Sequence, residues 1–161
     1  MTAVVLRPFA ADDLTWLVEE HAKAYRQAEG FDESFGPLVA SILKSFLATH
    51  KPEREAGWIA VRGEARLGSI FCVEEGRPGV AKLRLFYLVS FARGLGLGQR
   101  LLDTCLNFAR EAGYREIALW THESHRAACW LYRKNNFALL DSRPVHSFGV
   151  DLVEQSWSRA L

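Results

Sequence analysis

The stretch Arg93-Gly94-Leu95-Gly96-Leu97-Gly98 decides the fold class, because it joins a predicted strand (residues 81–89) to a predicted helix (residues 97–112). The first turn of a helix leaves backbone amides without partners, and its dipole adds partial positive charge there. Glycines remove the side chains that would keep an anion away from those amides. This order of elements therefore predicts a phosphate-binding site, with Arg93 and Arg100 as additional cationic contacts.

Two common nucleotide-binding fingerprints do not match this loop. The dinucleotide pattern G-x-G-x-x-G fails in both registers: starting at Gly94 it places Gln99 third, and starting at Gly96 it places Leu101 third. The Walker A loop requires a Gly-Lys pair, and the chain contains none. Neither nucleotide class therefore fits, and the loop either binds a phosphate compound of another class or forms a structural turn before the helix.

Strand and helix patterns outside the loop predict a mixed α/β fold. The predicted order is one strand, two helices, three strands, a helix, a strand, a helix and two strands. Capping residues support three of the helices: Asp12 or Asp13 before the first, Pro37 near the start of the second, and Ser124 before the last. We expect a single domain over residues 1–161, with a mostly antiparallel sheet of about seven strands flanked by about four helices. Strand signals cover residues 4–6, 58–61, 67–73, 81–89, 117–120, 137–140 and 145–153.

Composition excludes several classes of protein. The 161 residues are 49% hydrophobic and 24% charged, which argues against disorder. The net charge of +1 argues against direct binding to nucleic acid or to an anionic membrane surface. No apolar run approaches the length of a membrane span, and the N-terminal residues do not resemble a signal peptide. Three cysteines without a C-x-x-C pair suit a reducing compartment. We expect a cytoplasmic protein.

The glycine loop and several later motifs resemble one known family, the GCN5-related N-acetyltransferases, which bind acetyl-CoA. The resemblance covers most of the chain and is strongest to a subgroup that is often fused behind a MarR-type winged-helix repressor. No winged-helix segment is present, so the resemblance implies a free-standing acetyltransferase domain. The matching motifs are Arg93–Gly98, Asn107-Phe108-Ala109-Arg110, Gly113-Tyr114, Leu119-Trp120-Thr121, Leu131-Tyr132, Asn136-Phe137, Ser147-Phe148-Gly149, Asp151-Leu152 and Trp157.

The resemblance implies a role for particular residues. Leu88 and Val89 would offer backbone hydrogen bonds to the pantetheine arm, and an amide near Leu88 would face the thioester oxygen as negative charge develops. Tyr132 would protonate the leaving thiolate, which is reasonable for a phenol of pKa about 10 and a thiol of about 8.5. The residues that would wrap the pyrophosphate are Arg93, Gly94, Leu95, Gly96, Leu97, Gly98 and Gln99.

Three positions depart from the family pattern. Ser90 replaces a usual proline, and Asn136 replaces a glycine, although asparagine also tolerates a left-handed helix end. His125 stands where many members have an asparagine that contacts pantetheine or substrate. The role of that position is therefore open.

A general base must deprotonate the attacking amine. His122 and His125 follow a predicted strand that ends near the cleft, so either is a candidate, and Glu123 and His146 are weaker ones. For any one of these histidines, an ordinary surface position without such a role is the more common case. The H-x-x-H pair has no third ligand at a useful spacing, so we expect no metal.

Cysteine and acceptor-site residues complete the candidates. A cysteine nucleophile is disfavoured, because Cys72 and Cys105 lie on apolar faces and Cys129 has no evident activating partner. We expect the acceptor to bind near the first two helices and the loop of residues 29–33. The aromatic residues that could line that site, or belong to the core, are Tyr25, Phe31, Trp58 and Trp120.

Two functions follow as alternatives. The first is an acetyl-CoA-dependent N-acetyltransferase whose acceptor is a small-molecule or protein amine, attacking directly in a ternary complex. The second is a non-catalytic CoA-binding sensor that works with a transcriptional regulator. A homodimer is left open.

Overall fold

The computed structural model describes residues 2–161, and these form a seven-stranded mixed sheet with four α-helices. The strand order is β1-β2-β3-β4-β5-β7-β6. The pairs from β1 to β4 are antiparallel, whereas β4 and β5 are parallel. The predicted fold class is therefore confirmed. The strands are β1 (Val4–Pro8), β2 (Ala56–Arg62), β3 (Ala65–Glu74), β4 (Val80–Leu88), β5 (Glu116–His122), β6 (Ala138–Ser147) and β7 (Val150–Ala160), and the helices are α1 (Leu14–Glu29), α2 (Phe35–Thr49), α3 (Leu97–Glu111) and α4 (Arg126–Lys134).

The chain forms two compact units, and the boundary between them falls inside β5 and β7. The first unit comprises the residues up to Phe9 together with Lys51–Leu119 and Ser158–Leu161. The second comprises Ala10–His50 and Trp120–Trp157. The expectation of one domain over residues 1–161 stays a prediction.

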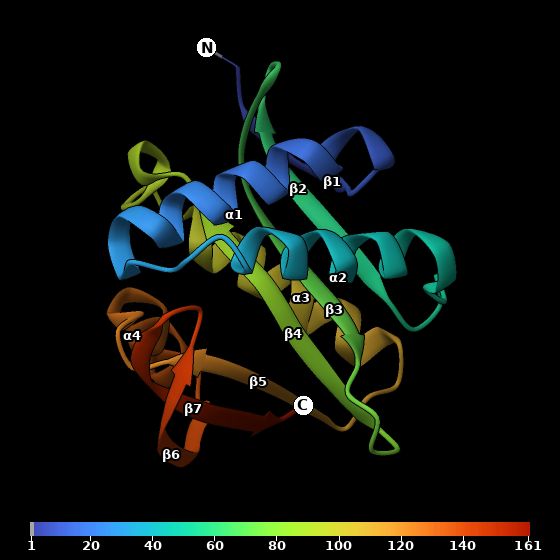
Figure 1. Cartoon of the computed structure of the whole chain (residues 1–161). Coiled ribbons are helices and arrows are strands. Elements are labelled where there is room, and N and C mark those ends of the chain that lie inside the picture. The colour runs from blue at the N-terminus through green and yellow to red at the C-terminus, as the bar shows by residue number, and fades with distance from the viewer. Residues whose placement is uncertain (1) are drawn as a thin grey trace. The chain divides into compact units, whose positions relative to one another are not determined.

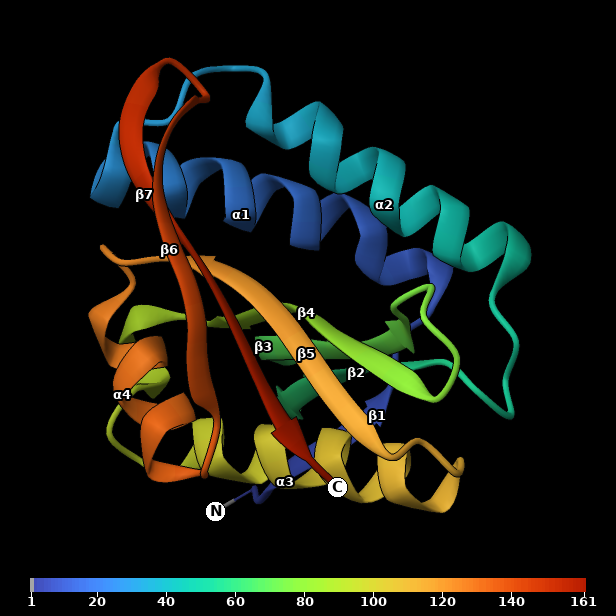
Figure 2. The ribbon, with the colours of Figure 1, turned by 90° about the horizontal axis from the view of Figure 1, so that it is seen from below.

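In the first unit, α3 lies along one face of the antiparallel strands (Figure 2). Its apolar residues recur every three or four positions, which places them on one side of the helix. Leu101, Leu102 and Cys105 are fully buried on that side. Burial of a leucine side chain stabilises a fold by about 2 kcal/mol, so this stripe anchors the helix that follows the glycine loop.

In the second unit, α1 and α2 lie side by side (Figure 1). Gly30 ends α1 in the left-handed conformation with a φ of 74°, as expected of a helix-terminating glycine. Asp13, one of the two predicted capping residues, occupies the N-cap position of α1, but it makes no side-chain capping bond and instead accepts from the Ala10 amide at 2.9 Å. The second helix begins at Phe35, two residues earlier than predicted, because Pro37 needs no amide partner in a first turn. No helix within residues 2–161 combines the length and the apolar character needed to cross a membrane.

The end of the second unit corrects two local predictions. Ser124 does not cap α4; His125 holds the N-cap position, without a side-chain capping bond. The strands predicted over 137–140 and 145–153 are longer and continuous, and they meet at a two-residue turn. Phe148 and Gly149 form that turn with φ values of 54° and 78°, a geometry that matches the twist of antiparallel strands. Asn136 is left-handed after α4, as predicted.

Candidate active site

The glycine loop of the first unit presents open backbone at the start of α3. Gly94 and Gly96 have φ values of 80° and 76°, and a Cβ built at either position meets no atom within 4 Å. Gly96 is the N-cap of α3, and the first intrahelical bond runs from the Arg100 amide to the Gly96 carbonyl at 3.2 Å. The amides of Leu97 and Gly98 precede that bond, and the first turn carries no acidic side chain. This loop has the backbone and the charge that an anion requires.

The side chains around the loop are less available than the sequence suggests. The Arg100 guanidinium donates from Nη2 to the Val4 carbonyl at 3.2 Å, so it is directed toward β1 and not toward the loop. The Gln99 side chain donates to Asp103 Oδ1 at 2.9 Å along the helix. Arg93 is exposed at the mouth of the loop. The expectation for Arg100 is thus corrected, whereas Arg93 keeps its predicted position.

The backbone groups of Leu88 and Val89, at the end of β4, point in opposite directions. The Val89 amide donates to the Leu67 carbonyl at 2.9 Å, and the Val89 carbonyl accepts from the Ala92 amide at 3.1 Å. This corrects the expectation that Val89 offers its amide to a ligand. Because neighbouring residues of a strand point their polar groups in opposite directions, Leu88 directs its amide and carbonyl away from β3.

That side of β4 is open. The registered pairs between β4 and β5 cover only Val80–Lys82 against Glu116–Ala118. Beyond Lys82 no pair in that register is described between the two strands within the first unit. The expected hydrogen bond from the Leu88 backbone to the pantetheine arm stays a prediction.

A β-bulge interrupts the pairing of β4 with β3. Leu85 has a φ of 51°, and the register with β3 shifts between Ser69 and Phe71. The fully buried Ser69 donates from Oγ to the Leu85 carbonyl at 2.7 Å. Bulges bend a strand and increase its twist. The bulge at Leu85 was not predicted, and the only indication of it in the sequence is Ser69, a serine within an apolar strand.

In the second unit, the predicted histidines lie at the junction of β5 and α4. His122 is the last residue of β5, and the ring centroids of His122 and His125 are 5.4 Å apart. Thr121 Oγ1 lies 3.2 Å from His125 Nδ1. His125 Nε2 lies 3.5 Å from Glu29 Oε1 at the end of α1. Within residues 2–161, His122 Nδ1 and His125 Nε2 are buried nitrogens without a hydrogen-bond partner.

Burial determines the charge of both rings. Burial lowers the pKa of His125 to about 4, although Glu29 raises it, and His122 lowers it further. Burial also lowers the pKa of His122, opposed by Glu154 and Glu29. Both imidazoles are therefore neutral at pH 7, with lone pairs that can accept a proton.

Aromatic side chains surround the two histidines. The Tyr25 ring lies 4.9 Å from His125, and the Phe31 ring lies 5.9 Å from His122, centroid to centroid. Phe35 and Phe148 join the same cluster and were not predicted; the Phe31 and Phe148 rings stack at 4.8 Å, and the Phe35 and Phe148 rings lie 5.0 Å apart. The structure thus brings Tyr25 and Phe31 together with the predicted histidines.

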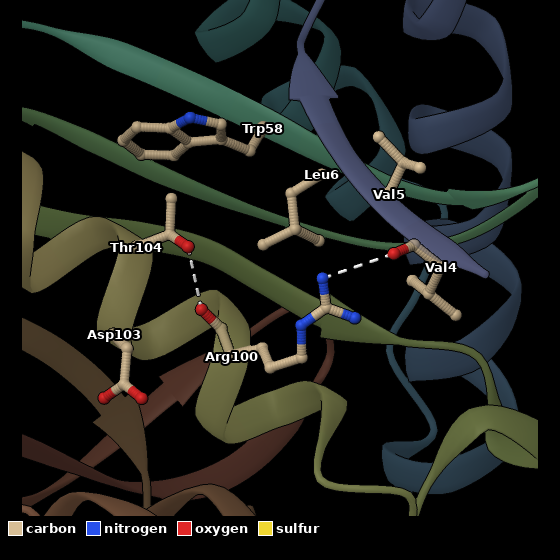
Figure 3. Close-up of a pocket in the computed structure, with 7 residues that line it drawn as sticks. All are labelled: Val4, Val5, Leu6, Trp58, Arg100, Asp103 and Thr104. Atoms are coloured by element: carbon tan, nitrogen blue, oxygen red, sulfur yellow. Dashed lines mark hydrogen bonds between the residues drawn. The ribbon is translucent and has the colours of Figure 1, made fainter.

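Trp58 lies elsewhere, in the first unit. Its ring packs against Phe108 at 5.5 Å. It also lines a hollow of about 600 Å³ beside β1, together with Arg100 and Thr104 (Figure 3). Within the first unit Trp58 therefore packs β2 against α3, and its place in an acceptor site stays a prediction. Trp120, the other predicted aromatic, is 45% exposed.

Tyr132 lies on α4 and is only 4% exposed. Its ring packs near Phe137 at 5.5 Å and near Trp157 at 6.3 Å. These contacts hold the tyrosine in one orientation within the second unit. Its role as an acid stays a prediction.

The remaining candidates are weaker. Burial raises the pKa of Cys129, and the contact with Cys72 raises the pKa of Cys105, which keeps both thiols protonated. His146 bonds to Asp151 at 2.8 Å on the exposed hairpin. Within residues 2–161, no group of three His, Cys, Asp or Glu side chains is arranged to hold a metal ion.

Comparison with known proteins identifies the family. The model of the acetyltransferase (GNAT) family matches residues 14–137. The chain belongs to the GNAT acetyltransferase family. Among curated relatives, N-acetyltransferase 8B of Rattus norvegicus is 36% identical over 99 residues, which are 58% of this chain and 43% of that protein. The chain spans about half the length, or less, of the curated relatives that it matches.

Solved structures of GNAT acetyltransferases share the fold. A GNAT acetyltransferase from Staphylococcus aureus Mu50 superposes with a TM-score of 0.80 at 18% identity, covering 99% of both chains. A putative acetyltransferase from Salmonella typhimurium, solved with its cofactor acetyl-CoA, gives a TM-score of 0.76 at 15% identity, covering 99% of this chain and 94% of that one. The predicted GNAT fold is thereby confirmed.

Proposed function

We propose that this GNAT acetyltransferase transfers the acetyl group of acetyl-CoA to a primary amine, by direct attack in a ternary complex. The observation that carries the proposal is the left-handed pair Gly94 and Gly96 leading into α3, next to a β4 edge on which Leu88 is unpaired by β5. The acetyl-CoA bound to the Salmonella relative supports the same cofactor.

The glycine loop fits the pyrophosphate of that cofactor. The space beside Gly94 and Gly96 is open, and the amides of Leu97 and Gly98 begin a helix whose first turn carries no acidic side chain. Acetyl-CoA supplies an activated acetyl thioester. In our proposal the Leu88 amide hydrogen-bonds to the thioester oxygen, where negative charge develops during the attack.

His125 is the proposed general base, with His122 as the second candidate. Burial keeps His125 neutral at pH 7, and Glu29 stabilises the imidazolium that forms when the ring takes a proton from the acceptor amine. Tyr132 is the proposed acid that protonates the leaving thiolate. The aromatic cluster around Tyr25 and Phe31 supports an acceptor site in the second unit.

Release of free thiol from acetyl-CoA across a panel of amines tests the proposal. We expect thiol release that depends on both the acceptor and the enzyme. Binding of CoA without any acceptor-dependent thiol above background would contradict catalysis.

The variant Tyr132→Phe separates an enzyme from a CoA-binding sensor, the alternative suggested by the resemblance to domains fused to MarR-type regulators. An enzyme that uses the phenol as an acid loses turnover by about 10²-fold or more and keeps its affinity for CoA. A sensor keeps its output unchanged. The three free cysteines suit a reducing compartment, so we propose a cytoplasmic location.

A further inference from the structure

Arg84 of β4 points away from α3. Leu83 pairs with Cys72 across the β3–β4 ladder, and Cys72 contacts Cys105 of α3. Leu83 and Cys72 therefore lie on the face that α3 covers. Because successive side chains of a strand alternate between faces, Arg84 projects from the opposite face of β4.

The guanidinium of Arg84 is partly buried and has no acceptor. Within residues 2–161 its side chain makes neither a hydrogen bond nor an ion pair, and burial lowers its pKa. Two other arginines of the first unit have partners: Arg54 donates to the Ala112 carbonyl at 2.7 Å, and Arg77 pairs with Glu75 and Glu116. A guanidinium carries five N–H donors, and on a half-buried side chain without a protein acceptor these donors are available to a ligand.

Lys82 shares the face of Arg84 but differs from it electrostatically. The two residues are two apart on β4, and their charges repel each other. Glu75 offsets the positive charge of Lys82. No carboxylate among the described residues does so for Arg84, whose pKa is shifted by burial alone. Arg84 is thus the cation on this face that lacks a counter-ion.

The position of Arg84 relates it to the proposed reaction. It lies past Lys82, where the registered pairs with β5 end, and it directly precedes the bulge residue Leu85. It lies four positions before Leu88, which corresponds to about 13 Å along a regular strand. Planar guanidinium groups bind carboxylates through two parallel hydrogen bonds.

We infer that Arg84 binds a carboxylate of the acceptor, so that the substrate is an amine that also carries an acid group. This inference rests on the proposed acetyl transfer. An anion of acetyl-CoA is the other source of the same chemistry. Arg84 precedes Leu88 in the chain, whereas the glycine loop follows it. The glycine loop is the better place for the cofactor's pyrophosphate, so the acceptor is favoured as the source of the carboxylate that Arg84 binds.

Matched acceptors test the inference on the wild-type enzyme. The series consists of amino carboxylates with an increasing number of methylene groups between amine and carboxylate, each compared with its amino carboxamide. We expect kcat/KM to favour the carboxylate by about tenfold to a hundredfold at the best spacing, which is the contribution of a hydrogen bond to a charged group. Equal rates for both members at every spacing would overturn the inference. An enzyme inactive on all amines would instead contradict the proposed acetyl transfer.

Variants of Arg84 assign the preference to this side chain. Arg84→Gln should abolish the preference, so that each carboxylate reacts no faster than its matched carboxamide, and should leave the Kd of acetyl-CoA unchanged. Arg62→Gln, which alters an exposed arginine of the same unit, should retain the preference. A preference retained in Arg84→Gln, or a weaker Kd of acetyl-CoA in that variant alone, would overturn the assignment.

The stability of Arg84→Met provides a second measurement. Methionine has a similar length and needs no hydrogen-bond acceptor, so we expect a higher melting temperature together with loss of the carboxylate preference. A lower melting temperature would show that Arg84 stabilises the fold, and would contradict the inference that its guanidinium binds a ligand.

Discussion

His125 Nε2 lies 3.5 Å from Glu29 Oε1, and the side chains of both residues are less than one-fifth exposed. The carboxylate closes α1, where the helix dipole disfavours negative charge, and it accompanies an imidazole that burial keeps neutral. Neither the carboxylate at the helix end nor the buried imidazole stabilises the folded chain by itself. Together they form a base whose protonated form lies beside a counter-ion.

The pH dependence of acetyl transfer should report this pair. Because the pKa of His125 is about 4, the acidic limb of kcat/KM should fall near pH 4 and not near 6.5. Glu29→Gln removes the charge that raises this pKa, so the acidic limb should move to lower pH. Rates measured from pH 3 to 8 check both expectations.

His125→Asn should lower kcat by about 10²-fold to 10⁴-fold if His125 is the base. His50→Asn, at the end of α2, is the control and should leave the rate unchanged. An unaltered rate in His125→Asn, with a large loss in His122→Asn, would transfer the role to His122.

Gly96→Ala should weaken binding of acetyl-CoA about tenfold or more. Its φ of 76° strains any residue with a Cβ by about 1–2 kcal/mol, and the methyl group would enter the open space beside the loop. Gly63 offers a matched control, because it has a φ of 59° and equally open surroundings in the turn between β2 and β3.

Isothermal titration of both glycine variants makes the comparison. Gly63→Ala should lose similar stability and keep the wild-type Kd. An unchanged Kd in Gly96→Ala would show that the loop does not hold the cofactor.

Ser69→Ala should destabilise the protein by about 1–3 kcal/mol, because the Leu85 carbonyl loses its 2.7 Å partner in a fully buried position. Urea unfolding measures the loss. Ser41→Ala on the exposed side of α2 should change stability by less than about 0.5 kcal/mol. Equal effects of the two substitutions would mean that the bulge does not depend on this bond.

Acid should destabilise the fold through His21. This residue is 2% exposed, its Nδ1 donates to the Leu17 carbonyl at 2.8 Å, and burial lowers its pKa to about 4. Between pH 6.5 and 4 the unfolded chain binds a proton that the folded chain does not, so stability falls as the pH falls. From pH 7 to 5 the expected loss from this histidine is about 2 kcal/mol.

His21→Asn should make unfolding in urea less sensitive to pH over that range, because asparagine does not titrate. His122 and His125 contribute in the same direction and remain in the variant. Ser41→Ala, on the exposed side of α2, is the control and should leave the pH dependence of unfolding unchanged. Identical pH dependence in wild type and His21→Asn would refute the assignment.

Features that depend on neighbouring residues were predictable from the sequence. The glycine loop before α3, the end of α1 at Gly30 and the left-handed Asn136 each follow from what a few consecutive residues can adopt. The strand and helix order followed from apolar periodicity, and with it the fold class.

Features that depend on distant residues were decided only by the tertiary structure. Phe148 takes a left-handed turn position that favours asparagine or glycine, and its stacking on Phe31 accompanies that strain. Glu29 joins His125 from nearly a hundred residues away, and Arg84 owes its face of β4 to the register with β3.

The physical reason is the range of the interactions. Backbone preferences and periodicity act over a few residues and can be read along the chain. The bulge at Leu85, the partners of a buried histidine and the lack of a partner for a guanidinium depend on which strands and helices meet. The sequence alone therefore determined the family and the glycine loop, and the tertiary structure determined which side chains lie together.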